Sequence, residues 1–304
     1  MLTAQRVKEL ARSLGADLCG IGDVSLFEGS PLQRDPRAIL PHARCVIGAA
    51  FRVPRGLYRT MADKTQFYNY LSLGVKYSDE ELAEIFLLKL AAMIEDEGYD
   101  ACVQRNVSNL RIKGDKTQNP ELLDTYELVH AEPVAQGKPA PDVILDFGEA
   151  ARITGIGKRG RSGSILTRRF GPFVRFVFIV TDAELETDPP FEGDLCDGCG
   201  ACSAACPGRA IDEAGIDTWQ CSVYYRGAHR SNPFMTDDFL AGDPRREAIL
   251  DGKERFDAES ARALYPKLDL LPDFKGYAPC LCGKACDVAC YEHMKEAGIL
   301  ENCN

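Results

Sequence analysis

Residues 195–211 read LCDGCGACSAACPGRAI, and the cysteines in this stretch are regularly spaced. The run C-x2-C-x2-C-x3-C consists of Cys196, Cys199, Cys202 and Cys206. Two-residue gaps let a short loop curl around a cubane and aim three thiolates at three irons. Gly198 and Gly200 would keep backbone amides close to the inorganic sulfurs. We expect the fourth cysteine to begin a helix directed away from the loop and to bind a neighbouring cluster. Pro207 suits the first turn of such a helix.

A structural zinc knuckle is the alternative for a run of cysteines. Zinc sites usually show two separated C-x2-C pairs, and they have no need of a Cys-Pro step. The C-x2-C-x2-C-x3-C-P spacing is instead typical of the [4Fe–4S] clusters of bacterial ferredoxins. The sequence therefore predicts an iron–sulfur cluster at this stretch.

A second group of cysteines follows in PCLCGKACDVAC, residues 279–290, and Cys221 stands alone between the groups. The second group consists of Cys280, Cys282, Cys286 and Cys290. We expect one cluster to be bound by Cys196, Cys199, Cys202 and one late cysteine, with Cys290 favoured. The other cluster would take Cys206, Cys221 and two of Cys280, Cys282 and Cys286. Two clusters need about eight thiolates, so one of Cys280, Cys282, Cys286 and Cys290 is a non-ligand.

This interleaved ligation has a consequence for the organisation of the chain. A cysteine that lies beside one cluster and binds the other ties residues 194–222 to residues 278–292 as one unit. The intervening segment 232–274 is rich in charge and proline. We expect this segment to be an excursion over the surface.

Composition limits the class of protein. A chain of 304 residues, 45% hydrophobic and 27% charged, has enough length for two soluble domains, expected at residues 1–190 and 191–304. No run of eighteen apolar residues occurs, so no membrane span is expected. The N-terminal helix pattern lacks the apolar core of a signal peptide, and thirteen cysteines argue for metal ligation in a reducing compartment, hence a cytoplasmic protein. The net charge of −10 opposes a large nucleic-acid footprint.

The first 150 residues alternate amphipathic helices with short apolar strands. Thr3 is a helix cap and Gly15 a helix end. Ser78 and Glu81 form a capping-box pattern before a helix that ends at Gly98. Strands are expected at residues 17–22, 45–51, 99–103 and 173–180. Cys19, Cys45 and Cys102 fall on these strands, where free thiols are most often core residues.

Residues 148–185 carry a series of glycines in GIGKRGRSGSILT. Gly155, Gly157 and Gly160 match G-x-G-x-x-G. A dinucleotide-binding fingerprint requires a strand, then the glycines, then a helix. Here the glycines follow a helix and precede a loop and a strand, so the fingerprint is rejected. The glycines would still let the backbone pass close to a large planar ligand.

The order of motifs in the second half of the chain resembles epoxyqueuosine reductases and reductive dehalogenases. This order is GIGKRGRSGSILT, FGPFVRF, TDAEL and then the cysteine run from Cys196. The early segment DPRAILPHARCVIG also looks like the first domain of that superfamily, and CGKACDVACYEHMKEAGIL is similar to a variant ferredoxin end. The resemblance is strong over residues 148–210 and covers most of the chain.

The resemblance implies an α+β protein in which a nitroreductase-like α/β domain is followed by a dicluster ferredoxin-like domain. It also implies cobalamin between the clusters and the substrate, held in part by the glycine-rich loop. The implied cofactor-binding residues are Gly155, Gly157, Lys158, Arg159, Gly160, Ser162, Gly163, Ser164 and Thr167. Lys158 and Arg159 stand where the family has apolar residues; they either bind a phosphate or carboxylate tail or are solvated. Asp142 and Asp146 are the candidates for a catalytic proton donor, with a turn or helix-cap role as the alternative.

The sequence leaves three functions in competition. The first is an iron–sulfur reductase that passes electrons from an external donor, such as ferredoxin or flavodoxin, to a cobamide or small-molecule site. The second is an electron carrier for a partner enzyme, and the third a corrinoid- or flavin-binding protein. We expect no tRNA substrate, because the chain is acidic and stops at Asn304, without the C-terminal helical-repeat extension of the epoxyqueuosine reductases. His293 is expected to be a surface residue of a helix.

Overall fold

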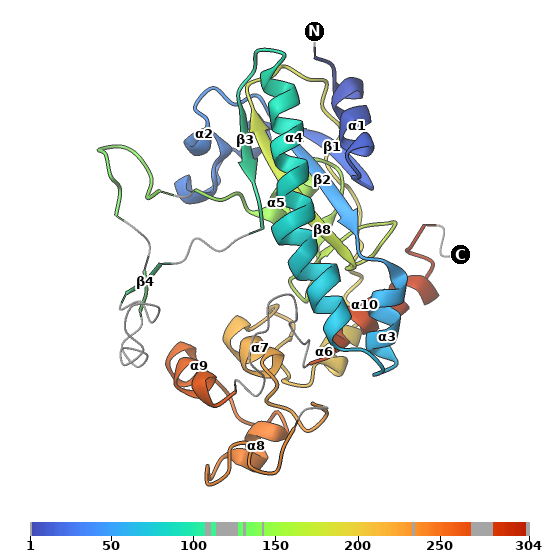
Figure 1. The fold of residues 1–304 in the computed structure, drawn as a ribbon, viewed down its shortest axis with the longest axis vertical. Coiled ribbons are helices and arrows are strands. Elements are labelled where there is room, and N and C mark those ends of the chain that lie inside the picture. Colours follow the sequence, from blue (N-terminus) through green and yellow to red (C-terminus); the bar gives the residue numbers. More distant parts are fainter. Residues whose placement is uncertain are drawn as a thin grey trace.

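The computed structural model describes residues 2–106, 111–113, 127–129, 132–141, 143–232, 235–268 and 282–301. Asp142 and Cys280, two of the residues singled out by the sequence, lie outside these ranges. The structure joins an antiparallel sheet with covering helices to a group of short helices that carries the cysteines (Figure 1).

A four-stranded sheet organises the first part of the chain, in the order β1-β2-β8-β3. Its strands are β1 (Leu18–Asp23), β2 (Cys45–Arg52), β8 (Val174–Thr181) and β3 (Ala101–Gln104). All neighbours are antiparallel, with Ile47 opposite both Ile21 and Ile179. All four strands were expected from the sequence to within a few residues. Two short pairs lie apart from this sheet, β4 (Arg111–Lys113) with β5 (Glu127–Val129) and β6 (Lys158–Arg159) with β7 (Ile165–Leu166).

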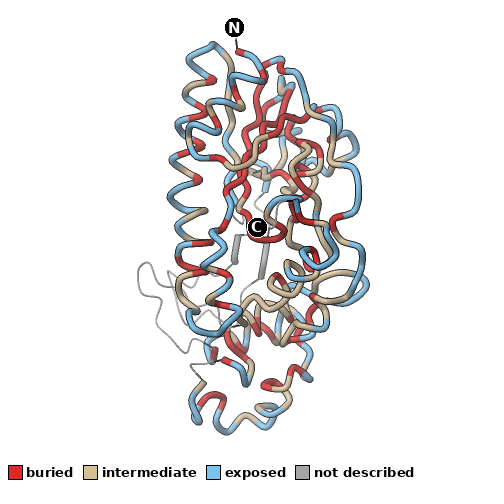
Figure 2. Tube along the Cα trace, turned by 90° about the vertical axis from the view of Figure 1, so that its right-hand side faces the viewer, coloured by how far each residue is buried: buried red, intermediate tan, exposed pale blue. Residues whose placement is uncertain are grey.

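The sheet is buried on both faces, as the near-continuous apolar sequence of β2 requires (Figure 2). Ile47 and Ile179 face a core that includes α1 (Ala4–Ser13) and α4 (Ala83–Glu95). Val46 and Val180 face the opposite core, to which α5 (Phe147–Ile153) contributes. Alternate residues of each strand thus serve two cores, which gives an α+β arrangement with helices on both sides of an antiparallel sheet.

The helix that covers one face begins earlier than the sequence predicts. Ser78 does not cap it: the residue lies inside π-helical turns, Tyr70–Lys76 and Ser78–Leu82, which run directly into α4. Two tertiary contacts account for the extension. Tyr70 is buried against Phe173, and Asp79 accepts a hydrogen bond of 2.9 Å from Nε of Arg175 on β8. Packing of these residues overrides the local capping pattern.

Two glycines let α5 approach the sheet backbone directly. A Cβ at Gly20 of β1 would lie 1.9 Å from the carbonyl oxygen of Thr154, and one at Gly48 of β2 would lie 2.7 Å from Oγ1 of the same residue. Thr154 follows α5 and is fully buried. Only glycine allows this contact, which fixes where the glycine-rich loop leaves the sheet.

The cysteine-bearing part is built from short helices. These are α6 (Ala201–Ala205), α7 (Thr218–Tyr225), α8 (Arg246–Leu250), α9 (Ala258–Leu264) and α10 (Ala285–Glu296). In Figure 1, α6 and α10 lie beside α3 (Arg55–Ala62), with α7, α8 and α9 farther from the sheet. α2 (Pro36–Ile39) is a single turn between β1 and β2.

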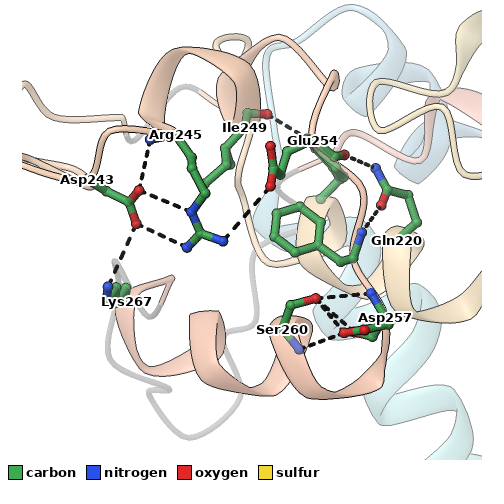
Figure 3. A network of polar contacts seen from close by, with 10 residues as sticks. Gln220, Asp243, Arg245, Ile249, Glu254, Asp257, Ser260 and Lys267 are labelled. Atoms are coloured by element: carbon green, nitrogen blue, oxygen red, sulfur yellow. Dashed lines mark hydrogen bonds and ion pairs between the residues drawn. The ribbon is translucent and has the colours of Figure 1, made fainter.

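The segment between the two cysteine groups is not a surface excursion, contrary to the prediction. Phe239, Ile249, Phe256 and Leu264 are buried and pack with Tyr224 of α7 in a core of their own. A polar network supports this core (Figure 3). The fully buried Gln220 donates to the carbonyls of Gly208 and Glu254, each at 2.9 Å, and accepts from the Phe256 amide at 3.0 Å. The apolar residues are too widely spaced in a charged sequence to form a periodic pattern, so this core could not be predicted from the sequence.

Within the residues that the structure describes, no helix is long and apolar enough to cross a bilayer.

Candidate metal centre

Four cysteines meet at a small cavity between the loop 195–200, α6 and α10. The cavity is lined by Cys196, Cys199, Cys202 and Cys290, together with Arg161, His293 and Met294. Gly198 and Gly200 both adopt φ of +79°, the left-handed region that glycine favours. The Ala201 amide lies 3.5 Å from the Cys199 sulfur, so a backbone donor faces this thiol.

Cys206 ends a helix and does not begin one, which corrects the sequence prediction. It is the C-cap of α6, with φ −69° and ψ 115°. The physical reason is the following proline, because the ring of Pro207 disfavours the helical conformation of the residue before it. The Ala210 amide lies 3.3 Å from the Cys206 sulfur. Cys206 nevertheless turns away from the first cavity toward other cysteines.

A second group of thiols forms around Cys206. Burial raises the pKa of the Cys221 thiol to about 11, and the nearby Cys282 and Cys206 contribute to the rise. Burial likewise raises the pKa of Cys286, with Asp287, Cys282 and Cys206 adding to it. Cys206 and Cys282 line one cavity, and both lie near enough to Cys221 and to Cys286 to raise the pKa of each thiol. Cys290 belongs with the first group, because its pKa, raised to about 12 chiefly by burial, also responds to Cys202, Cys196 and Cys199.

The donor sets suit iron–sulfur clusters. Each group offers four cysteines, which matches the four thiolates that hold a [4Fe–4S] cluster. All are buried or partly buried except Cys199, which is exposed. Burial disfavours an isolated thiolate, so a ligated iron would supply the charge that stabilises it. Cys19, Cys45 and Cys102 lie on the sheet strands, away from both groups. Burial raises the pKa of the Cys19 thiol to about 12, as expected for a core residue.

A buried polar network links α10 to the glycine-rich loop. The Asp287 carboxylate, on a residue 3% exposed, accepts a hydrogen bond of 2.7 Å from the Ser164 hydroxyl. Its other oxygen lies 3.2 Å from Nζ of Lys284. Lys284 also lies over the ring of Tyr225 and adopts φ of +44°. The network stands between the two cysteine groups, since Asp287 influences the pKa of both Cys286 and Cys290.

His293 is held beside the first cysteine group. Its Nε2 lies 2.7 Å from the Asp197 carboxylate, and the two residues share a compact cluster with the Cys199 sulfur. The imidazole lowers the pKa of Asp197. The residue is on the outer part of α10 as predicted, but this contact with the cysteine loop was not foreseen. No local pattern connects positions 197 and 293.

The glycine-rich loop is a hairpin whose charged residues have partners. Lys158 Nζ lies 2.8 Å from Asp194, and Arg159 Nη2 lies 2.5 Å from Asp146. Asp146 caps α5 by accepting from the Glu149 amide at 3.0 Å. In the structure Asp146 is therefore a helix-cap residue, which is the alternative to the proposed role as a catalytic proton donor.

Several residues of this loop meet protein atoms at close range. A Cβ at Gly155 would lie 2.7 Å from the Pro189 carbonyl, and one at Gly157 would lie 2.6 Å from the Leu166 carbonyl. Gly160 and Gly163 close the turn with a hydrogen bond of 3.0 Å. Ser162 and Thr167 are buried, and the Thr167 hydroxyl accepts from the Phe170 amide at 3.0 Å. Helix α5, loop and hairpin follow in that order, which agrees with rejecting a dinucleotide fingerprint.

Comparison with known proteins identifies the family. Residues 189–212 match the model of the 4Fe-4S binding domain. The epoxyqueuosine reductase of Leadbetterella byssophila is 32% identical over 226 residues, which covers 73% of this chain and 68% of the relative. The chain belongs to the epoxyqueuosine reductase and reductive dehalogenase superfamily. The resemblance noted in the sequence is thereby confirmed.

Further members of this superfamily match shorter stretches. The tetrachloroethene reductive dehalogenase of Desulfitobacterium hafniense is 40% identical over 60 residues, 19% of this chain and 11% of that protein. A solved catabolic reductive dehalogenase shares the fold, with a TM-score of 0.50 and 18% identity over 88% of this chain and 36% of that one. The chain thus spans about a tenth of the length of the dehalogenases that it matches in sequence.

Proposed function

We propose that this chain is an iron–sulfur reductase that carries electrons through two [4Fe–4S] clusters to a substrate site. The observation that supports the proposal most strongly is the sorting of eight cysteines into two groups of four. One cluster would be held by Cys196, Cys199, Cys202 and Cys290. The other would be held by Cys206, Cys221, Cys282 and Cys286. Cys280 is then the non-ligand of the late group.

The two proposed clusters would lie next to each other. Cys202 and Cys206 are at opposite ends of α6, and Cys286 and Cys290 are one turn apart on α10. α6 packs against α10, so each helix would contribute one ligand to either cluster. The clusters would supply one-electron transfer. The chain would hold the ligands, exclude water around Cys202 and Asp287, and keep a backbone donor near Cys199 and Cys206.

The electron acceptor is part of the proposal. A nitroreductase-like first domain with a cobamide is what the family resemblance implies, and the helix-covered antiparallel sheet agrees with it. In the loop 155–164, Lys158 and Arg159 are already paired with Asp194 and Asp146, and the glycines contact protein atoms, so these residues do not fit the cofactor-binding role that the resemblance implies. We therefore derive no step through a corrinoid. Cobalt absorption bands after addition of cobalamin to the anaerobic protein would identify this acceptor.

The substrate class covers small molecules and tRNA. The expectation of no tRNA finds no support in the comparisons, since the relative that covers most of the chain is an epoxyqueuosine reductase. The dehalogenase relatives act, by their name, on tetrachloroethene. We propose a reductase of one of these two kinds. Filter binding of a tRNA stem-loop at physiological salt separates them, because non-specific binding shows about 10⁻⁴–10⁻⁶ M affinity under these conditions.

Iron analysis with two cysteine variants tests the proposal. Anaerobically reconstituted protein should contain about eight irons and eight acid-labile sulfides per chain. Cys221→Ser should lose about half of the iron and one of two EPR-active centres. Cys102→Ser, the matched control on β3, should keep both. Zinc in place of iron, or equal loss from both substitutions, would refute the ligand assignment.

A further inference from the structure

A cavity of about 490 Å³ opens between α3, the end of α6 and the start of α10. Two sulfur ligands proposed for the second cluster, Cys206 and Cys282, line it. Its lining includes small or apolar side chains, among them Ala205, Ala289 and Val288. The cavity therefore reaches from the molecular surface to one cluster. The first group of cysteines lines a different and smaller cavity.

The rim of this cavity is basic in an otherwise acidic protein. Lys64 and Arg209 are exposed lining residues, and neither has an ion-pair partner among the residues described. Asp251, the acidic member of the described lining, is already paired with Arg230 at 2.6 Å and with Lys253 at 3.1 Å. The chain as a whole carries a net charge of −10. A positively charged rim on an acidic protein favours a negatively charged binding partner.

The backbone holds both cations in an unfavourable conformation. Lys64 has φ of +59° and Arg209 has φ of +50°. A residue with a side chain is strained in such a conformation, which persists only where the surrounding structure imposes it. Arg209 is fixed further by its carbonyl, which accepts a hydrogen bond of 2.7 Å from Arg255. Two of the non-glycine residues with positive φ in the described chain thus stand on one rim.

We propose that this cavity is the docking site of a small acidic electron-carrier protein that reduces the cluster held by Cys206, Cys221, Cys282 and Cys286. This inference rests on the proposed function and specifies where its electrons enter. One electron leaves the reduced carrier and the oxidised cluster accepts it, with no bond formed or broken. The charges of Lys64 and Arg209 steer the encounter, and the small side chains of the lining let the carrier approach the ligand sulfurs. Electron-transfer encounters of this kind need an interface below about 1,200 Å².

Stopped-flow reduction tests the docking site. Lys64→Glu/Arg209→Glu reverses the rim, and Arg6→Glu/Lys89→Glu reverses two exposed cations on α1 and α4 with the same change in net charge. The probes are a reduced acidic [2Fe–2S] ferredoxin and the methyl viologen radical cation. At low ionic strength the rim variant should react with ferredoxin about tenfold or more slowly, with a weaker salt dependence. Lys64→Gln/Arg209→Gln should give an intermediate rate.

The two reductants separate the possible outcomes. Methyl viologen is a cation, so the rim variant should be reduced by it at least as fast as the unaltered protein. Equal ferredoxin rates in the rim variant and the α1/α4 control, at equal iron content, would overturn the docking site. If neither reductant bleaches the cluster absorption of the unaltered protein, the proposed function fails, and the docking inference falls with it.

Discussion

Replacement of Asp287 is expected to destabilise the protein strongly, because the carboxylate is buried and has two partners. Asp287→Ala would leave Lys284 without its ion-pair partner at 3.2 Å and would remove the hydrogen bond of 2.7 Å from Ser164. Breaking a buried pair costs about 3–5 kcal/mol. The Lys284 side chain is 27% exposed, so water reaches it in part, and we expect the lower end of that range, about 3 kcal/mol.

A double-mutant cycle measures the pair itself. Asp287→Leu and Lys284→Met should each cost about 2–3 kcal/mol, since each leaves a charged partner behind. The double variant removes both charges and should be less destabilised than the sum by about 2 kcal/mol. Glu292→Ala, an exposed change on the same helix, should stay within about 0.5 kcal/mol.

Thermal unfolding followed by circular dichroism, with iron measured in every variant, reports these differences. About 3 kcal/mol corresponds to a fall in Tm of roughly 6–12 °C, at about 2–4 °C per kcal/mol for domains of 150–250 residues. Additive single-variant effects would refute the pairing of Lys284 with Asp287. A loss below about 1 kcal/mol in Asp287→Ala would refute its burial.

Two further predictions concern the packing that positions the site. Gly20→Ala should cost about 3 kcal/mol or more, because the new Cβ meets the Thr154 carbonyl at 1.9 Å, whereas Gly56→Ala on α3 meets nothing within 4 Å and should stabilise by about 0.5–1 kcal/mol. Urea unfolding of both variants checks the opposite signs, and a shared sign would contradict the model of the contact. Gln220→Ala should cost at least about 3 kcal/mol, since three buried backbone groups lose their partner. A cost below about 1 kcal/mol in the same assay would mean that water replaces the side chain.

The sheet was predictable because its strands carry their own signal. Residues 45–51 carry no polar side chain apart from the Cys45 thiol, and Arg175 is the one charged residue in 173–180. Nearly continuous apolar runs of that length fit strands buried on both faces. The loop spacing also predicts which three sulfurs share a cavity, and Cys196, Cys199 and Cys202 line one together with Cys290. Their role as cluster ligands stays a prediction. The spacing of the late cysteines does not show how α10 is oriented, and this orientation decides which cysteine faces which group. The structure brings Cys286 toward Cys206 and Cys290 toward Cys202.

The errors arose where tertiary contacts outweigh local patterns. Ser78 and Glu81 match a capping box, yet the burial of Tyr70 and the contact of Asp79 with Arg175 continue the helix upstream. Cys206 was expected to start a helix, although the proline that follows it favours an extended backbone at that position. The contacts of Asp287, Lys284 and His293 could not be predicted from the sequence. Asp287 and His293 contact Ser164 and Asp197, which are distant in sequence. Lys284 pairs with Asp287 one turn away on the same helix.

The glycine-rich loop connects the sheet to the cysteine-bearing part of the chain. Its glycines were interpreted as a place where the backbone passes close to a flat ligand, and that role remains a prediction. In the structure Gly155 and Gly157 allow close contacts with the chain itself, and Ser164 at the hairpin turn reaches the Asp287 carboxylate between the two cysteine groups. Thr154, the C-cap of α5, packs against the backbone of Gly20 and Gly48, and the glycine-rich loop begins at the next residue. A rigid path of short contacts therefore runs from the sheet to the proposed clusters, which is the arrangement that a reductase needs if its acceptor site and its electron source are to keep a constant separation.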